Sequence, residues 1–565
     1  MSEESEPLLL PVISPITEPV SGDLANTAAV ETQTLTPLRT RTIVLALYLG
    51  SFLAALDTTI VATLLPTIAS DLDASSQMSW IATSYLLSCS AFQPLYGKLS
   101  DIFGRKMLLL WSNAVFAIGC VICGSPWTNN VWVLSAGRFI AGIGGGGLST
   151  LSTITTSDII PLRQRGVYQG LGNIVFSFGC ASGSILGALL QQGIGWRWAF
   201  LIQVPLALLS FVLVATILNL PAKSPGRGLI FLERDQGNKL KWSKVIKMID
   251  FVGGFTLISS MLLLMIAITF LNDVSSLSVM QWVLLLASLV IFVGLFIQAE
   301  MTAANPVVPL NLLFENRTVL ASSLTNWFCT MATFSIMYYI PVFWQAVYHF
   351  DPWQISLRSI SNFLGISMGS LLSGIYMKRT GKYWKYSTFV NSFFVLGTFS
   401  LFLSAFRSRE QGVLEFVLMF LPGFGYATML TVTLLALIAS VDFSHQAQVT
   451  SIQYAFRATG STLGVALAGL LYQWGLQHKL ESVVLTDKTL LADYGLRKLT
   501  KWCSQILKDN MFDTSFDERF TALVHGSFMF SSLCALAFAA TMAILGLTTS
   551  LFMREHTLHT SVPSK

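Results

Sequence analysis

Long apolar stretches recur along most of the chain and alternate with short polar or basic segments. Each stretch has about 18–25 residues, which is long enough to cross a ~30 Å hydrocarbon core as a helix. The pattern therefore predicts fourteen membrane-spanning helices. Their expected ranges are 42–65, 79–97, 107–125, 131–153, 168–191, 199–219, 249–271, 280–299, 319–342, 356–376, 386–406, 413–440, 446–475 and 524–550.

The composition also indicates that lipid is the main solvent. Hydrophobic residues make up 53% of the 565 residues and charged residues only 11%, and the mean hydropathy is +0.64. A chain with so few charges could not cover the surface of soluble domains of this total length. These values exclude a disordered protein, a disulfide scaffold and a soluble enzyme. The net charge of +5 gives no electrostatic support for binding nucleic acid.

Cysteine usage gives no sign of a metal or redox site. Six of the seven cysteines lie in apolar stretches, as small buried residues do. Cys120 and Cys123 form a CxxC pair, but it lies inside a predicted span and has no further ligands nearby in the sequence. We therefore expect no cofactor and no metal.

The placement of Lys and Arg predicts the orientation in the membrane. Residues 1–38 are polar and contain no signal peptide, so the first span is expected to act as an uncleaved signal. Basic clusters follow the second, fourth, sixth and tenth spans, and basic residues mark the cytosolic side. Both termini are therefore expected in the cytosol.

An internal repeat supports the count of spans. The segment Gly97–Lys106 follows the second span, and a similar segment, Gly374–Lys382, follows the tenth. Eight spans separate the two copies, which indicates two six-helix bundles with two inserted helices between them. The expected organisation is a disordered cytosolic tail (1–41), an N-terminal bundle (42–219), a basic cytosolic loop (220–248), the inserted helices (249–299), a cytosolic linker (300–318), a C-terminal bundle (319–550, with an exocytosolic loop at 476–523) and a cytosolic tail (551–565).

The segment after the second span combines glycines and charges at close spacing. Gly97 and Gly104 permit tight turns and a close approach between helices. Asp101 can pair with Arg105 and Lys106, so these side chains are expected to form a charged latch between helix ends at the cytosolic face.

Asp158 stands at the cytosolic end of the fourth span. Arg163 and Arg165 follow it closely in the sequence. We expect Asp158 to take part in a latch rather than to contact a substrate.

The segment Gly97–Lys106 resembles the signature of the major facilitator superfamily, G-x-L-x-D-x-x-G-R-K, which follows the second span in that family. The chain is also similar to the fourteen-span drug:proton antiporters, at Leu56–Val61 and at Trp196–Phe200. Within that group it looks most like fungal vacuolar basic amino acid transporters. The segments that carry this last resemblance are Gly142–Gly147, Ser157–Ile159 and Arg165–Gly170.

The fifth span departs from the family pattern. Antiporters of this group usually carry G-x-x-x-G-P-x-x-G-G there, and this chain has Ser184 in place of the Pro and Ala188 in place of the last Gly. Gly179, Gly183 and Gly187 remain, so the face that packs against a neighbouring helix is expected to persist. The bend that depends on the Pro is not expected.

Charged residues inside predicted spans are candidates for coupling. Asp57 lies near the middle of the first span, where a buried carboxylate suits proton binding, although a static hydrogen bond to a neighbouring helix is the alternative. The family resemblance assigns Arg138 to proton coupling, and a structural tie to a carbonyl is the alternative. Arg457 could meet a substrate carboxylate or a partner acid, or serve a structural role.

The N-terminal tail carries a candidate sorting signal. Glu4 is followed by Leu8 and Leu9 at the spacing of an acidic dileucine signal, which sorting adaptors read when they deliver cargo to vacuoles. A sorting adaptor is therefore a candidate partner, and the vacuolar membrane is the expected location.

Together these features predict an all-α membrane protein with the major facilitator fold and fourteen helices arranged 6+2+6. It is expected to be a proton-coupled secondary transporter, not an enzyme, that works by alternating access. By resemblance, its substrates are basic amino acids (Lys, Arg and His), which enter the vacuole by proton antiport. The alternatives are a plasma-membrane exporter of drugs or toxins and a nutrient sensor that does not transport.

Overall fold

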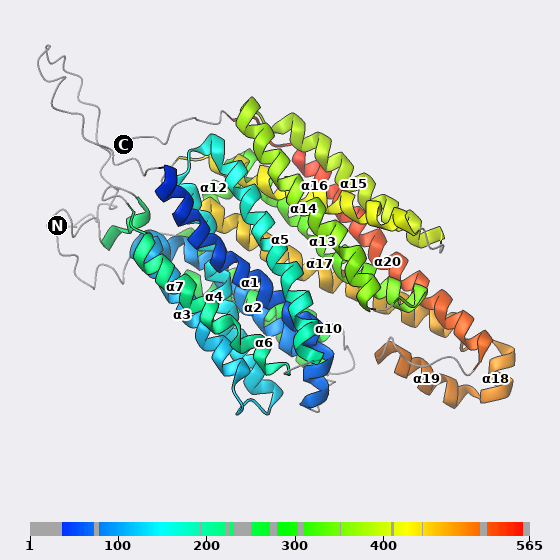
Figure 1. The fold of residues 1–565 in the computed structure, drawn as a ribbon. Coiled ribbons are helices and arrows are strands. Elements are labelled where there is room, and N and C mark those ends of the chain that lie inside the picture. The colour runs from blue at the N-terminus through cyan, green and yellow to red at the C-terminus, as the bar shows by residue number, and fades with distance from the viewer. Residues whose placement is uncertain are drawn as a thin grey trace, which may run out of the picture.

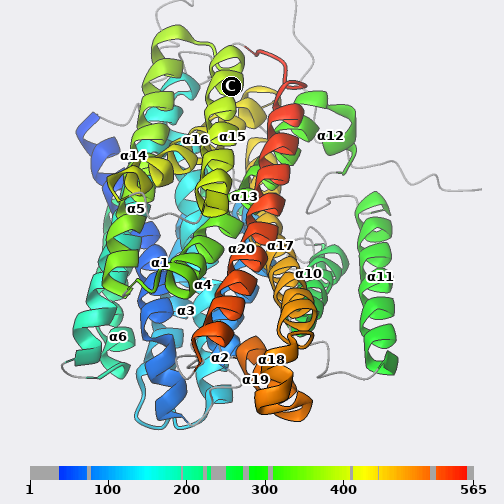
Figure 2. The same cartoon turned by 90° about the vertical axis from the view of Figure 1, so that its right-hand side faces the viewer.

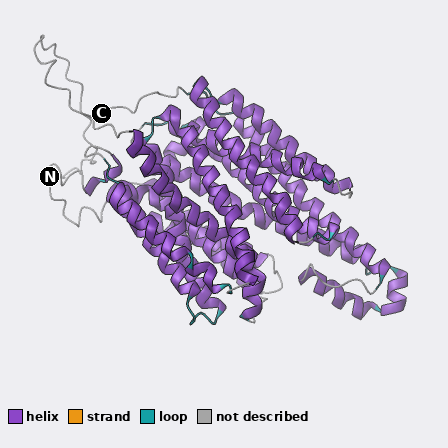
Figure 3. Ribbon diagram, in the orientation of Figure 1, coloured by secondary structure: helices purple, strands orange, loops and turns teal. Residues whose placement is uncertain are grey.

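Every secondary-structure element in the residues that the computed structural model describes is a helix (Figure 3). These residues are 37–72, 78–192, 195–220, 225–230, 250–271, 279–302, 310–350, 352–407, 412–442, 445–508 and 517–556. The long helices run roughly parallel to one another and form two bundles (Figure 1).

The first bundle contains the helices from Pro37 to Ile217. Its sixth expected span is interrupted at Ile202, because Pro205 cannot donate an N–H to the carbonyl of Leu201. The helices are α1 (Pro37–Asp71), α2 (Met78–Phe103), α3 (Arg105–Gly124), α4 (Val131–Ile159), α5 (Leu162–Gln192), α6 (Arg197–Leu201) and α7 (Gln203–Ile217).

The second bundle begins at α13. Its helices are α13 (Arg317–Tyr348), α14 (Pro352–Thr380), α15 (Trp384–Arg407), α16 (Val413–Ala439), α17 (Gln446–Val483) and α20 (Glu518–Ser550). Short polar side chains cap the N-termini of several helices, where they accept hydrogen bonds from the first free N–H groups. Asn130 does so for α4, Asn316 for α13 and Asp517 for α20.

Two helices lie between the bundles in sequence, α10 (Phe251–Leu271) and α11 (Val279–Thr302). Helix α10 packs against both α2 and α17, whereas α11 packs on α10 and stands at the edge of the molecule (Figure 2). Along α11 only Glu300 is buried. A short helix, α12 (Leu310–Glu315), precedes the second bundle.

The range expected as the exocytosolic loop 476–523 contains much helix. Helix α17 continues to Val483, and two short helices follow, α18 (Lys488–Tyr494) and α19 (Leu496–Lys508). They lie at the end of the molecule farthest from α12 (Figure 1). The apolar side of α19 is buried with the second bundle through Leu499, Cys503 and Ile506, which explains why a polar segment is ordered there.

Ten helices of the described chain are long and apolar enough to cross a membrane. Every expected span falls on a helix, but those expected at 79–97, 249–271, 319–342 and 446–475 are not among these ten, and the apolar part found for 249–271 is only Phe251–Leu264. The complete fourteen-span 6+2+6 arrangement and the domain boundaries given above therefore stay predictions.

Glycines bring α4 close to its neighbours. A Cβ atom at Gly142 would lie 2.1 Å from Ser88 Oγ of α2, and one at Gly144 would lie 2.4 Å from the backbone N of Phe116 in α3. Such distances leave no room for a side chain. The run of glycines in α4 thus serves packing.

Candidate functional site

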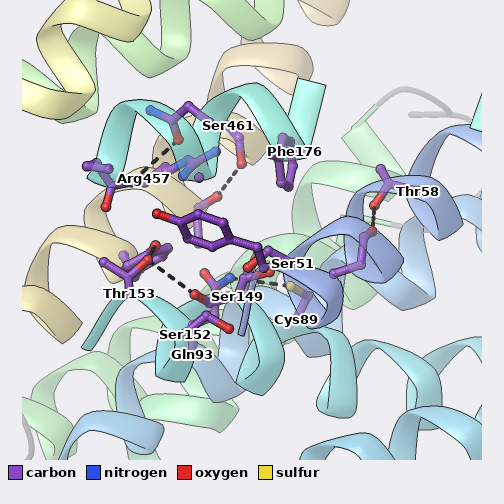
Figure 4. A pocket seen from close by; sticks show the side chains of 18 of the residues that line it. Ser51, Thr58, Cys89, Gln93, Ser149, Ser152, Thr153, Phe176, Arg457 and Ser461 are labelled. Atoms are coloured by element: carbon purple, nitrogen blue, oxygen red, sulfur yellow. Dashed lines mark hydrogen bonds between the residues drawn. The ribbon is translucent and has the colours of Figure 1, made fainter. Parts of the chain in front are cut away.

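A cavity lined mostly by residues with polar side chains lies between the two bundles. It has a volume of about 160 Å³ and is lined by α1, α2, α4 and α5 from the first bundle and by α13 and α17 from the second (Figure 4). Its polar side chains are mostly uncharged: Tyr48, Ser51, Thr58, Tyr85, Ser90, Gln93, Ser149, Ser152, Thr153, Thr156, Tyr168, Gln169, Asn173, Tyr454 and Ser461.

Arg457 is the one charged side chain among the described residues that line this cavity. It projects from α17 and is partly buried. Its guanidinium carbon lies 5.9 Å from the ring centres of both Phe176 and Tyr454, so aromatic rings from the two bundles flank it. The Tyr454 hydroxyl is hydrogen bonded to Thr153 of α4 at 2.6 Å, which joins the two bundles beside the cavity.

A buried ion pair lies directly behind the cavity wall. Arg138 Nη1 of α4 is 2.5 Å from Asp57 Oδ2 of α1, and both side chains are at most 2% exposed. Gln203 of α7 donates a hydrogen bond to the other carboxylate oxygen at 3.3 Å. The pair therefore ties three helices of the first bundle together.

Tyr85 connects this ion pair to the cavity. Tyr85 lines the cavity, and the Arg138 guanidinium lies 4.4 Å from the centre of its ring. Arg138 also donates from Nε to the Ile81 carbonyl at 3.4 Å. A change in charge at Asp57 would thus be felt at the cavity surface through one intervening side chain.

The structure brings together two residues that the sequence presents separately. Asp57 and Arg138 are each expected to take part in coupling, and their pairing across 81 positions leaves no trace in the sequence. The static contacts considered as alternatives are also present, since Asp57 accepts from Gln203 and Arg138 donates to Ile81. Sequence analysis missed Gln203, although a glutamine in an otherwise apolar span was an available signal.

The latch residues meet at Arg105. Its guanidinium is 2.8 Å from Asp101 and 2.9 Å from Asp158, and it also donates to Ser100. Asp158 is thus part of the latch through its ion pair with Arg105, and it also interacts electrostatically with Arg165.

The other members of the motif lie nearby. Lys106 donates to Asn219 at 2.9 Å. Gly104 has φ +89°, and a Cβ atom there would lie 2.3 Å from the Arg227 carbonyl, so only glycine fits. Gly97 lies one turn before Asp101 in α2.

Arg163 and Arg165 contact the second bundle instead. Arg163 donates to the carbonyls of Lys378 and Arg379 at 2.7 and 3.1 Å, at the end of α14. Arg165 donates to Gln446 at the start of α17, at 2.8 Å. Together with the close approach of α5 to α14, these bonds close the gap between the bundles on the side that the basic residues predict to be cytosolic.

Removing the Arg163 side chain is expected to loosen this closed side. Arg163→Ala removes the donor to two exposed carbonyls at the end of α14 and takes about 0.5–1.5 kcal/mol from the closed state. The reactivity of a cysteine placed at Ser370, which is buried in the same interface, should rise several-fold toward a membrane-impermeant maleimide. Lys382→Ala, which removes an exposed basic side chain at the same end, is the control. Equal labelling of both variants would contradict the role of Arg163.

A second charged cluster, also missed from sequence, attaches the inserted helices to the latch. Lys98, next to Gly97 in α2, interacts electrostatically with Asp101 and with Asp250 and Glu300 of the inserted pair. A Cβ atom at Gly253 would lie 2.1 Å from Asp250 and 2.9 Å from Glu300, so the two carboxylates converge on that glycine.

The glycines of α5 lie against α1. A Cβ atom at Gly179 would be 2.8 Å from the Phe52 carbonyl, and one at Gly183 would be 2.2 Å from Thr59 Oγ1. Gly187 is buried as well. The candidate sorting residues Glu4, Leu8 and Leu9 lie outside the described residues.

Residues 47–465 match the Major Facilitator Superfamily. The chain belongs to this superfamily. Its fold is also similar to that of the proton:xylose symporter XylE, with a TM-score of 0.59 and 15% identity over 92% of this chain and 98% of the other. The human organic anion transporter MFSD10 gives a TM-score of 0.54 with 16% identity over 87% and 99%.

Fungal members of the superfamily are more similar in sequence. Multidrug resistance protein fnx1 of Schizosaccharomyces pombe is 34% identical over 92% of this chain and 94% of its own. Vacuolar basic amino acid transporter 1 of Saccharomyces cerevisiae is 30% identical over 92% and 93%. Efflux pump FUS6 of Gibberella moniliformis is 31% identical over 80% and 78%. This superfamily member is therefore a multi-pass membrane transporter of small molecules.

Proposed function

We propose that the protein is a proton-coupled antiporter that moves the basic amino acids Lys, Arg and His from the cytosol into an acidic vacuole. The observation that carries this proposal is the buried Asp57–Arg138 pair, which lies one side chain behind a polar cavity between two bundles. A carboxylate held inside a membrane protein is a natural site for a transported proton.

The ion pair supplies the coupling. When a proton from the acidic side binds Asp57, the carboxylate loses its charge, and Arg138 loses the partner that compensates for its burial. Burying a cation without a partner costs free energy, so Arg138 moves toward other acceptors and changes its contact with Tyr85 in the cavity wall. Protonation and cavity shape thus change together, which is the requirement for exchange.

Alternating access supplies the movement. The two bundles rock around the cavity, so that it opens first to one side and then to the other. In the structure the bonds from Arg163 and Arg165 hold the bundles together at the end with the basic clusters. This arrangement corresponds to a state closed to the cytosol, in which Asp57 exchanges protons with the acidic compartment.

The topology belongs to the same proposal. Fourteen spans place both termini in the cytosol, together with the latch around Arg105 and the basic clusters. The vacuolar assignment is supported by the resemblance to relatives named as vacuolar amino acid transporters and by the dileucine signal of the tail.

The test is uptake of labelled Lys, Arg and His into vacuolar vesicles that carry the protein. Uptake should require an imposed proton gradient, stop when a protonophore collapses that gradient, and be absent from vesicles that lack the protein. Uptake that persists without a gradient would contradict coupling. Absence of uptake of all three amino acids would contradict the substrate assignment.

Export of drugs or toxins at the plasma membrane is the second candidate. Its support is the similarity to fnx1 and FUS6, which are named as a multidrug resistance protein and an efflux pump. The location of a tagged wild-type protein separates the two candidates, because the vacuolar function requires the vacuolar membrane.

The tail prediction concerns Leu8 and Leu9. Changing both to Ala should move a tagged protein from the vacuolar membrane to the cell surface, because a sorting adaptor loses the pair that it reads. Transport by the purified variant should equal that of the wild type, since the change lies far before α1. A double variant that remains in the vacuolar membrane would show that sorting information lies elsewhere.

A further inference from the structure

We infer that the cavity recognises its substrate by the carboxylate, through Arg457, and not by the charge of the substrate side chain. This inference rests on the proposed amino acid transport and deepens it. It makes Arg457 the residue that determines the substrate class, which is molecules with a free carboxylate.

The first argument is the charge of the cavity wall. Among the described residues that line the cavity, Arg457 is the one charged side chain, and none is an Asp or a Glu. Asp57 directly precedes the lining residue Thr58, but it is fully buried and already paired with Arg138. A cationic side chain of a substrate therefore finds no ionic partner on the cavity surface.

The second argument is the state of Arg457 itself. Within the part of the chain that the structure describes, no carboxylate forms an ion pair with it, and its polar partners are the side chains of Tyr426 and Tyr454. An arginine inside a membrane bundle is costly unless an anion or several acceptors compensate for it. The planar guanidinium, set between the rings of Phe176 and Tyr454, suits bidentate binding of a carboxylate.

The third argument concerns the ammonium groups of an amino acid. The cavity offers them uncharged oxygens, among them those of Thr153, Gln169 and Asn173, and the faces of tyrosine rings. Such groups can bind a cation, but they can also bind a neutral polar group. Neutral amino acids of similar size should therefore bind about as well as lysine, and a diamine without a carboxylate should be repelled by Arg457.

The experiment measures ligand binding to the purified full-length protein by thermal stabilisation. The ligands are lysine, Nε-acetyl-lysine (neutral side chain), lysine methyl ester (no free carboxylate) and cadaverine (no carboxyl group). Lysine and Nε-acetyl-lysine should stabilise the wild type at similar concentrations. The ester and cadaverine should need concentrations roughly 30-fold higher or more, as for loss of a buried charged contact.

Variants at Arg457 give a second measurement. Arg457→Gln should weaken lysine binding by a similar factor and abolish the preference for lysine over its methyl ester, while Arg457→Lys should keep part of that preference. Arg497→Gln, which changes an exposed arginine of α19, is the matched control and should bind as the wild type does.

The possible outcomes are distinct. If the ester and cadaverine bind as well as lysine, or if Arg457→Gln keeps the preference for the free carboxylate, the inference is wrong, even where lysine transport is intact. If neutral amino acids bind and lysine does not, recognition through Arg457 stands and the proposed basic substrates are wrong. If no carboxylate ligand stabilises the wild type, both are wrong.

Discussion

Asp57→Asn should abolish accumulation of substrate driven by a proton gradient. Asparagine keeps the size of the side chain and can still accept the bond from Gln203, but it cannot take up a proton or carry the charge that Arg138 needs. In proteoliposomes with an imposed pH gradient, accumulation should fall to the level of empty liposomes. Exchange of labelled for unlabelled substrate without a gradient tests whether the cavity still functions.

The variant leaves Arg138 buried without its counter-charge, which costs about 3–5 kcal/mol when one partner of a buried pair is removed. Poor folding could therefore imitate loss of coupling. The double variant Asp57→Asn with Arg138→Gln removes both charges and restores neutrality, so it should recover thermal stability without recovering accumulation. Gradient-driven accumulation by either correctly folded variant would contradict the assignment of Asp57 as the proton site.

Arg105→Gln should lower the transport rate by about 10- to 100-fold while substrate binding changes little. Arg105 is 2% exposed and is shared by Asp101 and Asp158, so its removal leaves these two carboxylates without the cation that forms ion pairs with both of them. One lost charge-assisted contact accounts for about 1.5–3 kcal/mol, which corresponds to that range of rates if the latch stabilises one state of the cycle.

Asp101→Ala provides the graded comparison. It removes one of the two carboxylates and leaves the pair between Arg105 and Asp158 intact, and Asp101 is already 27% exposed. Its effect on the rate should be smaller than that of Arg105→Gln. Rates at saturating substrate and binding constants, measured separately on purified protein, decide the matter. If Arg105→Gln weakens binding and leaves turnover unchanged, the latch has no role in the cycle.

The positions of the helices could be predicted from the sequence because hydropathy reflects the solvent of each segment. The helices extend beyond the apolar stretches where the chain continues past the hydrocarbon core. Helix α1 begins at Pro37 and α17 runs to Val483, so both include polar turns that hydropathy assigns to loops. The order of α19 depends on the apolar residues that it buries against another helix, which a window along the sequence cannot detect.

The partners of the charged residues could not be predicted in the same way. Asp57 and Arg138 stand out because charge is rare inside spans, but their contact depends on depth and rotation in two different helices. Asp158 is a second example, since Arg163 and Arg165 are near it in the sequence but its ion pair is with Arg105, 53 positions away. Gln203 was missed because an uncharged residue in a span draws less attention than a charged one.

The contact between Arg163 and α14 differs from the other polar contacts in how it responds to mutation. Its acceptors are main-chain carbonyls of Lys378 and Arg379, which every amino acid supplies. Substitutions at these two positions therefore leave the acceptors in place, as long as α14 ends at the same residue. The Asp57–Arg138 pair, by contrast, can be lost through a change on either side. Over evolutionary time the contact between Arg163 and α14 can persist while the side chains on the surface of α14 diverge. The Asp57–Arg138 pair can change only if both residues change together.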